Sequence, residues 1–156
     1  MTFGADDVHD DPEAHHARLH YLGHLDGVKA AFTVSENLTL WSGLRGAVDN
    51  NAAALDRLGL APLANMPARY LSAGQRRRLA LARLLGAPAP LWLLDEPSVA
   101  LDTASVAALE SVIAEHRAGG GIVIVSTNVD LGVADPLRLN LADHAPSDED
   151  AWAIGA

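Results

Sequence analysis

Residues 91–97, LWLLDEP, constrain the fold more than any other part of this 156-residue sequence. Four consecutive apolar residues leave no polar face, so they predict a strand buried on both faces, as in a parallel sheet. Asp95 and Glu96 follow at the carboxyl end of that strand, where α/β proteins bind ligands. One acid there can hold Mg²⁺ while the other polarises an attacking water. The alternative is a strand that ends in a charged turn, which is common for an isolated string of this kind.

Strands and helices alternate along the rest of the chain, which predicts the α/β class. Two capping-box pairs, Thr33 with Glu36 and Ser72 with Gln75, mark the starts of helices, and Asp49 is a candidate cap for another. Strands are expected at residues 19–22, 91–94, 122–125 and 137–141, and helices at 35–46, 49–58, 73–86 and 103–117. The helices between about 35 and 75 form an all-helical insert in this alternation.

Composition excludes several classes of function. The chain is 49% hydrophobic, enough for the core of one domain, and its net charge of -9 opposes general nucleic-acid binding. The lack of cysteine excludes disulfides, thiolate zinc sites and cysteine nucleophiles. No apolar run approaches the roughly 18–20 residues of a membrane-spanning helix, and the acidic start does not have the pattern of a signal peptide. We therefore expect a cytosolic protein.

A second candidate site lies at LSAGQ, residues 71–75. The first turn of the helix after Ser72 offers unpaired N–H groups, a hydroxyl and, at Gly74, an unobstructed backbone, which together suit a phosphate. Alone, this stretch is only a good helix start. Its place in the chain adds specificity, because Leu91, which begins the strand before the acid pair, lies sixteen residues after Gln75, and SVALD follows at residues 98–102.

Taken together, these motifs resemble the ATP-binding subunits of ABC transporters over about residues 19–145. The resemblance makes LSAGQ the signature motif, the acid pair the Walker B motif and SVALD the D-loop. Residues 21–41, YLGHLDGVKAAFTVSENLTLW, look most like the haem exporter ATPase of cytochrome c biogenesis. The implied fold is a partial P-loop NTPase (RecA-like) parallel sheet core with an all-helical ABC subdomain.

The resemblance assigns roles to individual residues and implies ATP and Mg²⁺ as cofactors. Asp95 would bind Mg²⁺ and Glu96 would act as the general base. His24 stands where most members place a glutamine, and it suits Mg²⁺ poorly, so it would sense the partner subunit. Asn128 stands where the family has its switch histidine, although an amide cannot change charge near neutral pH. The nucleotide-binding residues would be His24, Ser72, Ala73, Gly74, Gln75, Asp95 and Asp102.

The sequence departs from the family at one important point. It contains no G-x-x-x-x-G-K-[ST] phosphate loop (Walker A), because Val28 precedes Lys29, the sole lysine. We expect the chain to be truncated at its N-terminus, and to bind ATP weakly and hydrolyse none alone, although its family is an ABC-type ATPase (translocase). We also expect the missing elements to leave apolar sheet surface uncovered around Leu93, Leu94 and Val123.

The resemblance also implies partners and an organisation of the chain. In the family, two subunits sandwich ATP, and each site combines the Walker motifs of one chain with the signature of the other. We expect a dimer with itself or with an intact subunit, ABC permease membrane subunits as partners, no nucleic acid, and a peripheral position on the cytoplasmic face of the cell membrane. The single domain, 1–156, would divide into an N-terminal and Q-loop region (1–34), a helical subdomain (35–75), a Walker B, D-loop and switch core (76–145) and a tail (146–156).

Two other readings of function stay open. The chain could be a non-catalytic partner that lends its signature to a complete subunit, or the product of a truncated reading frame without a function of its own. An in-frame G-x-x-x-x-G-K-[ST] immediately upstream in the DNA would favour the ATPase, and capture of an intact subunit would separate the other two.

Two weaker clusters need a structural test. His16 and His20, with Glu13 nearby, have a spacing that could bind a metal on a helix, although a solvated acidic helix is the better interpretation. The arginines of the helix after the signature, with Arg69, could form a nucleic-acid patch. We expect that helix to display Arg76, Arg77, Arg78 and Arg83 to solvent or to phosphate.

Overall fold

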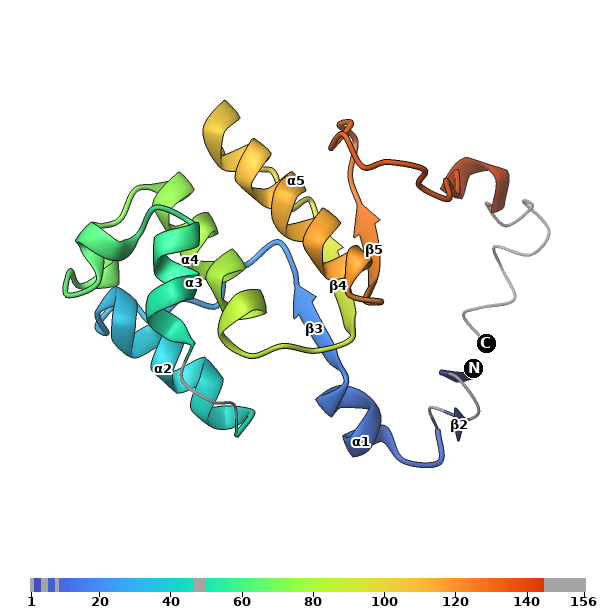
Figure 1. Cartoon of the computed structure of the whole chain (residues 1–156), viewed down its shortest axis with the longest axis horizontal. Coiled ribbons are helices and arrows are strands. Elements are labelled where there is room, and N and C mark those ends of the chain that lie inside the picture. The colour runs from blue at the N-terminus through green and yellow to red at the C-terminus, as the bar shows by residue number, and fades with distance from the viewer. Residues whose placement is uncertain (1, 4–5, 8, 47–49, 145–156) are drawn as a thin grey trace, which may run out of the picture.

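A computed structural model describes residues 2–3, 6–7, 9–46 and 50–144 (Figure 1). At its centre is a three-stranded parallel sheet of β3 (Leu19–Leu22), β4 (Leu91–Asp95) and β5 (Ile122–Ser126), in that order. The predicted α/β class and parallel sheet are confirmed. The candidate cap at Asp49 and the tail at 146–156 lie outside the described residues.

Helices form the insert and the connections around this sheet. The short strands β1 (Thr2–Phe3) and β2 (Asp6–Asp7) pair antiparallel ahead of α1 (Pro12–Ala17). The helical insert contains α2 (Val34–Leu44), α3 (Asn51–Arg57) and the 3-10 turns η1 (Ala61–Leu63) and η2 (Ala68–Tyr70). It leads into α4 (Ala73–Gly86), and α5 (Thr103–Ala118) then connects β4 to β5.

Local sequence signals explain where these helices begin. The capping boxes at Thr33 and Ser72 are both formed, with the hydroxyl accepting from the N3 amide and the N3 side chain accepting from the cap amide. Each box satisfies two N–H groups that a helix start otherwise leaves unpaired. The starts of α2 and α4 are therefore confirmed within one residue.

The strand predicted at 137–141 is wrong. Within the described segment 50–144, residues 137–140 adopt no regular structure and η3 (Leu141–His144) is a 3-10 turn. Leu137 is fully exposed and Leu139 is 71% exposed. The apolar alternation favours a strand, but these side chains bury too little surface to hold one against the edge of the sheet.

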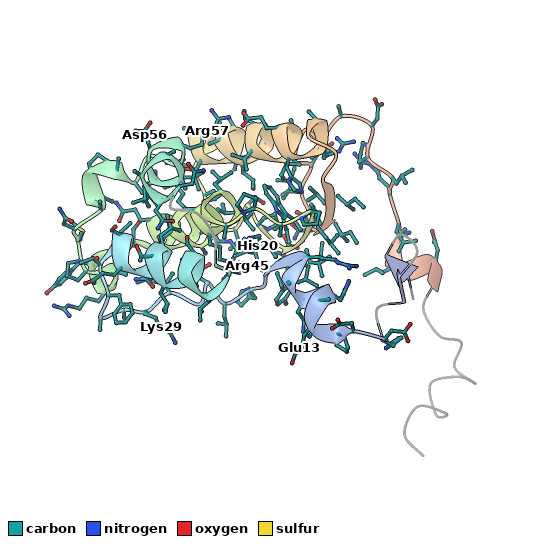
Figure 2. The ribbon with its side chains drawn as sticks, turned by 60° about the horizontal axis from the view of Figure 1, so that its bottom comes forward. Glu13, His20, Lys29, Arg45, Asp56 and Arg57 are labelled. Carbon is teal, nitrogen blue, oxygen red and sulfur yellow. The ribbon has the colours of Figure 1, made fainter. Side chains whose placement is uncertain are left out.

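The core lies between one face of the sheet and the helices α2 to α5. Leu22, Trp92 and Leu94 point into it, together with buried leucines of the helical insert and of α5. His20 also points to this side, beside Arg45, and its Nε2 donates to the Ala87 carbonyl (Figure 2). The covered face thus takes alternate residues of each strand, as the pleat requires.

The opposite face of the sheet is open, so the expected burial on both faces is wrong in this structure. Tyr21, Leu93 and Ile124 are register partners on that face, and Tyr21 and Ile124 are 60% and 56% exposed. The expectation of uncovered apolar surface is confirmed, but two of its three residues were misplaced. Leu94 is buried against the helices and Val123 is half-buried on the same covered face.

Candidate functional site

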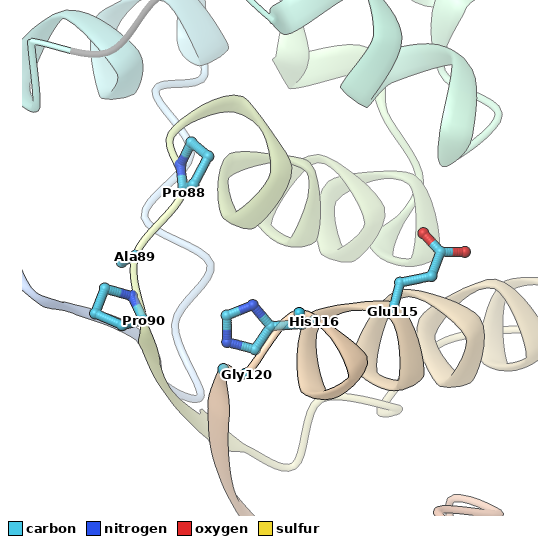
Figure 3. A pocket seen from close by; sticks show the side chains of 8 residues that line it. Pro88, Ala89, Pro90, Glu115, His116 and Gly120 are labelled. Carbon is cyan, nitrogen blue, oxygen red and sulfur yellow. The ribbon is translucent and has the colours of Figure 1, made fainter.

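The two edges of the sheet differ in chemistry. At the amino edge, a hollow of about 330 Å³ is lined by Pro88, Pro90, His116 and the glycine turn 119–121 (Figure 3). The His116 ring stacks on Trp92 with a centroid distance of 3.8 Å, and the one carboxylate of the lining, Glu115, pairs with Arg57. The residues that the sequence singled out lie at the carboxyl edge instead, which is where parallel sheets bind ligands.

Three of the predicted site segments meet at that carboxyl edge. His24 follows β3, the acid pair Asp95 and Glu96 ends β4, and Asn128 follows β5. Asp95 pairs in register with Ser126, and the Glu96 amide donates to the Ser126 carbonyl at 2.8 Å. The parallel order β3–β4–β5 therefore places these side chains in one row along the edge.

Glu96 has an unusual backbone. Its φ is +43°, a left-handed conformation that costs a non-glycine residue about 1–2 kcal/mol. Its carbonyl accepts from the amide of Val99, and its Oε2 lies 3.4 Å from the hydroxyl of Thr127. The turn directs the side chain toward β5 and the segment that carries Asn128.

The signature residues form the first turn of α4. Ser72 and Ala73 are exposed, while Gly74 and Gln75 are partly buried. The Ser72 hydroxyl accepts from the Gln75 amide at 3.2 Å, and the Gln75 side chain turns back to accept from the Ser72 amide at 2.8 Å. The Gln75 side chain thus serves the cap, and the exposed N-terminal turn leaves amide groups for an anion.

Gly74 also has a packing reason that sequence reasoning missed. A Cβ at this position would lie 2.6 Å from the carbonyl oxygen of Ala100, a distance that real side chains do not reach. Ala100 itself has a φ of +64° in the D-loop. The absence of a side chain at Gly74 therefore lets the signature turn contact the D-loop of the same chain.

Asp102 ends the D-loop and caps α5. Its carboxylate accepts from the Ser105 amide at 2.8 Å, and hydrogen bonding to Ser105 lowers the pKa of Asp102 below its usual value. In the described structure, Asp102 therefore holds the end of the D-loop in place, and the exposed turn at Val99 leads up to it.

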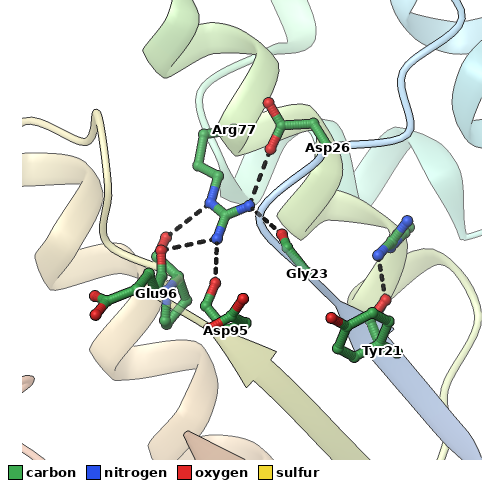
Figure 4. A network of polar contacts seen from close by, with 8 residues as sticks. Tyr21, Gly23, Asp26, Arg77, Asp95 and Glu96 are labelled. Carbon is green, nitrogen blue, oxygen red and sulfur yellow. Dashed lines mark hydrogen bonds and ion pairs between the residues drawn. The ribbon is translucent and has the colours of Figure 1, made fainter. Parts of the chain in front are cut away.

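Arg77 is the most important residue that the sequence analysis misjudged. It was expected at the surface, yet only 4% of it is exposed (Figure 4). Its guanidinium donates to the carbonyls of Gly23, Asp95, Glu96 and Pro97 and to the carboxylate of Asp26. A signal was available, because position 77 falls on the buried stripe of α4 with Ala80, Leu81 and Leu84.

The neighbouring arginines also differ from the expected patch. Arg78 donates to the Leu58 carbonyl at 3.1 Å, and Arg83 donates to the Tyr21 carbonyl. Burial lowers the pKa of Arg83, with the charge of Arg77 adding to this effect. Arg69 is exposed and stacks on Tyr70. Arg78 and Arg83, like Arg77, therefore donate to backbone carbonyls of the domain.

The structure separates the residues of the metal-binding alternative at the N-terminus. The helix ends at Ala17, so His20 lies on β3 and not on a helix with His16 and Glu13. Burial lowers the pKa of His20 to about 4, although the hydrogen bond to Ala87 raises it in part. A buried neutral imidazole that bonds a carbonyl is a core residue. Figure 2 shows it inside the domain, apart from Glu13 on α1.

The carboxyl edge fits Mg²⁺ that arrives with a phosphate ligand. Within the described residues, no group of three or more His, Cys, Asp or Glu side chains could hold a metal by itself. Mg²⁺ in proteins is commonly held by one or two carboxylates together with substrate phosphates and water. The partly buried Asp95, at the end of β4, supplies one such oxygen donor.

Comparisons with known proteins agree with these motifs. The ABC transporter family matches residues 1–99. The chain is 50% identical over 154 residues to the cytochrome c biogenesis ATP-binding export protein CcmA of Paramagnetospirillum magneticum, covering 96% of this chain and 71% of that protein. It is 52% identical over 147 residues to CcmA of Rhodospirillum rubrum, covering 94% of this chain and 63% of that one.

Solved structures support the fold. An ATP-binding subunit of an ABC transporter superposes with a TM-score of 0.71 at 20% identity, over 81% of this chain and 55% of that one. A dimeric ATP-binding cassette bound to ADP and phosphate superposes with a TM-score of 0.67 at 24% identity, over 80% and 58%. This chain thus spans little more than half of each solved structure. Among the described residues, no helix is long and apolar enough to cross a membrane.

Proposed function

This chain belongs to the ABC transporter family of ATP-binding proteins, and from that premise we propose that it is the ATP-binding subunit of a transporter that exports haem for cytochrome c biogenesis. The observation that carries the proposal is the row of His24, Asp95, Glu96 and Asn128 at one sheet edge, with the signature turn against the D-loop. Identity near 50% to two CcmA proteins supports the choice of subfamily.

At its own nucleotide, the chain supplies the residues of the carboxyl edge. Mg²⁺, when bound, neutralises phosphate charge and orients the oxygens of the nucleotide. Asp95 would hold that ion, and Glu96 would accept a proton from the attacking water as general base. Asn128 donates a hydrogen bond toward the γ-phosphate, and His24 senses the partner subunit from the loop after β3.

At a second nucleotide, the chain supplies its signature. The exposed first turn of α4 presents Ser72, Ala73, Gly74 and Gln75 to ATP held on the facing subunit of a dimer. Asp102 and the D-loop position that turn from behind. The permease subunits would contact this assembly at the cytoplasmic face of the membrane, with the chain bound there as a peripheral subunit.

The sequence indicates how much of ATP binding and hydrolysis the chain can carry out alone. Because residues 1–156 contain no G-x-x-x-x-G-K-[ST], the backbone nest and lysine that hold the β- and γ-phosphates are not supplied by these residues. Weak ATP binding and no hydrolysis follow for the chain alone. A non-catalytic partner that lends its signature to a complete subunit is the second candidate, and the exposed Ser72 turn favours it equally.

We also propose the division of the domain into regions at 1–34, 35–75, 76–145 and 146–156. The helix α4 runs across the boundary at 75 and packs on both α2 and α3. The signature turn at its start is therefore joined rigidly to the Walker B region through the helix itself.

The test separates the two acids. In a version extended at the N-terminus by the strand, phosphate loop and helix of a relative, Glu96→Gln should stop turnover and leave ATP bound. Asp95→Asn should weaken Mg²⁺-ATP binding itself. Calorimetry and a phosphate-release assay measure the two effects. Equal binding defects in both variants would contradict these assignments, and micromolar ATP affinity in the unextended chain, abolished by Asp95→Ala, would contradict the expected weak binding.

A further inference from the structure

Arg77 uses all of its N–H donors on two separate loops. Nε donates to the Pro97 carbonyl at 3.2 Å, and Nη2 donates to the Asp95 and Glu96 carbonyls, both at 2.8 Å. Nη1 donates to the Gly23 carbonyl at 2.9 Å and to Asp26 Oδ1 at 3.0 Å. An arginine has five such donors, and these five bonds therefore account for the whole guanidinium.

The two groups of bonds lie on opposite sides of the guanidinium (Figure 4). Nε and Nη2 hold the end of β4 and the turn that contains the left-handed Glu96. Nη1 holds the loop after β3, which carries His24 between its two partners Gly23 and Asp26. Both sides are anchored to α4, five residues after the signature serine.

We propose that Arg77 is a positioning residue that sets the place of the Glu96 turn and of the His24 loop relative to the signature helix. The importance of these positions for catalysis rests on the function proposed above, but the geometry does not. Movement of the Glu96 turn would change the distance between the acid pair and the first turn of α4, and movement of the other loop would change the position of His24 relative to both.

The chemistry of arginine explains why this residue type is needed. A planar guanidinium can reach several carbonyls and a carboxylate in one plane, whereas a lysine ammonium has three donors on one atom. Asp26 is the sole carboxylate among the five acceptors, so it provides the formal counter-charge for this buried cation. The other four acceptors are backbone carbonyls, which tie the loops themselves rather than their side chains.

The division of the bonds allows the two loops to be tested one at a time. Asp26→Asn removes the ion pair on the His24 side and leaves the three bonds to the Glu96 turn in place. Arg77→Lys weakens both sides while keeping the charge. Arg78→Lys is the matched control, because Arg78 is the next residue on α4 and its bond goes to Leu58 in the helical insert.

Amide hydrogen exchange in the full chain without nucleotide, followed residue by residue by NMR, provides the readout. The Val99 amide donates to the Glu96 carbonyl and reports on one loop, and the Lys29 amide donates to Asn37 and reports on the other. Arg77→Lys should speed exchange of both amides by about tenfold or more, Asp26→Asn that of Lys29 alone, and Arg78→Lys neither.

Thermal melts of every variant keep this test separate from overall stability. Rates are compared at equal distances below each melting midpoint, since a purely structural defect would speed exchange throughout the core. The proposal is overturned if Arg77→Lys speeds neither amide selectively, or if Asp26→Asn affects Val99 as much as Lys29. Because no nucleotide is present, a failure of ATP to bind would count only against the proposed function.

Discussion

The two faces of the sheet β3–β4–β5 have similar apolar composition and opposite surroundings. On β3, Leu22 is fully buried while its neighbour Tyr21 is 60% exposed, and on β4, Leu94 is buried while Leu93 is only partly so. Large apolar side chains predominate on both faces, so composition alone does not distinguish them. The helices α4 and α5 pack on one face, and the functional loops lie at the edge between the two. The difference shows that the packing of helices on a face, and not the sequence of the strands, decides how much each residue stabilises the fold.

The neighbours Leu94 and Leu93 give the largest and most direct test of this comparison. Leu94→Ala should lower the free energy of unfolding by about 2–5 kcal/mol, because it leaves a cavity under the helices. Leu93→Ala on the open face should cost about 1 kcal/mol or less, since less surface leaves water on folding. Urea denaturation of both variants measures the effects. Equal losses would show that the two faces are buried to the same extent.

His20, on the covered face, should make stability depend on pH. Burial lowers its pKa in the folded chain to about 4 from 6.5, so the unfolded chain binds the proton first as the pH falls. The stabilisation is complete above pH 6.5 and is lost between 6.5 and 4, by at most about 3 kcal/mol.

Urea denaturation at pH 7 and at pH 5 can isolate this contribution. His20→Leu should be less sensitive to the change of pH than the native chain. If His20→Leu and the native chain lose the same stability between these pH values, His20 is not buried in its neutral form.

The helix α4, which packs on the buried face, can also be destabilised at its start. Ser72→Ala removes the hydroxyl that accepts from the Gln75 amide, and we expect a loss of about 1 kcal/mol. Thr103→Ala is the control, because Thr103 is exposed at the first position of α5, where the cap is provided by Asp102. A thermal melt that moves equally for both variants would argue against the capping box.

The smallest effect on stability is expected on the open face itself. Ile124→Lys should change the free energy of unfolding by about 0.5 kcal/mol or less, because its side chain is already mostly in water. It should nevertheless reduce binding of a hydrophobic dye and self-association in sedimentation, since it interrupts an apolar patch. If Ile124→Lys bound as much dye as the native chain, the dye-binding apolar surface would not be the open face of the sheet.

Sequence reasoning predicted the parts of the molecule that depend on local signals. The capping boxes at Thr33 and Ser72 and the strand before Asp95 each follow from short-range hydrogen bonding or from a run of one residue type. The carboxyl edge could be predicted from the same signals, because parallel strands place their ends together.

The features that sequence reasoning missed depend on contacts between distant segments. The burial of Arg77 depends on carbonyls that approach from loops 18 to 54 residues away in the chain. Gly74 is explained by the Ala100 carbonyl, which the motif does not reveal. The open face of the sheet could not be read from β4, because its apolar run is the same whether one face or both are covered.

In the proposed dimer, the exposed Ser72 turn acts on a nucleotide held by another subunit. The most direct test measures ATP hydrolysis by a complete ABC ATP-binding subunit whose own signature serine has been replaced by alanine, with and without this chain. We expect the chain to restore hydrolysis by about tenfold or more, equivalent to about 1.4 kcal/mol in the transition state, and its Ser72→Ala variant not to do so. No restoration by the native chain, or equal restoration by Ser72→Ala, would contradict the claim.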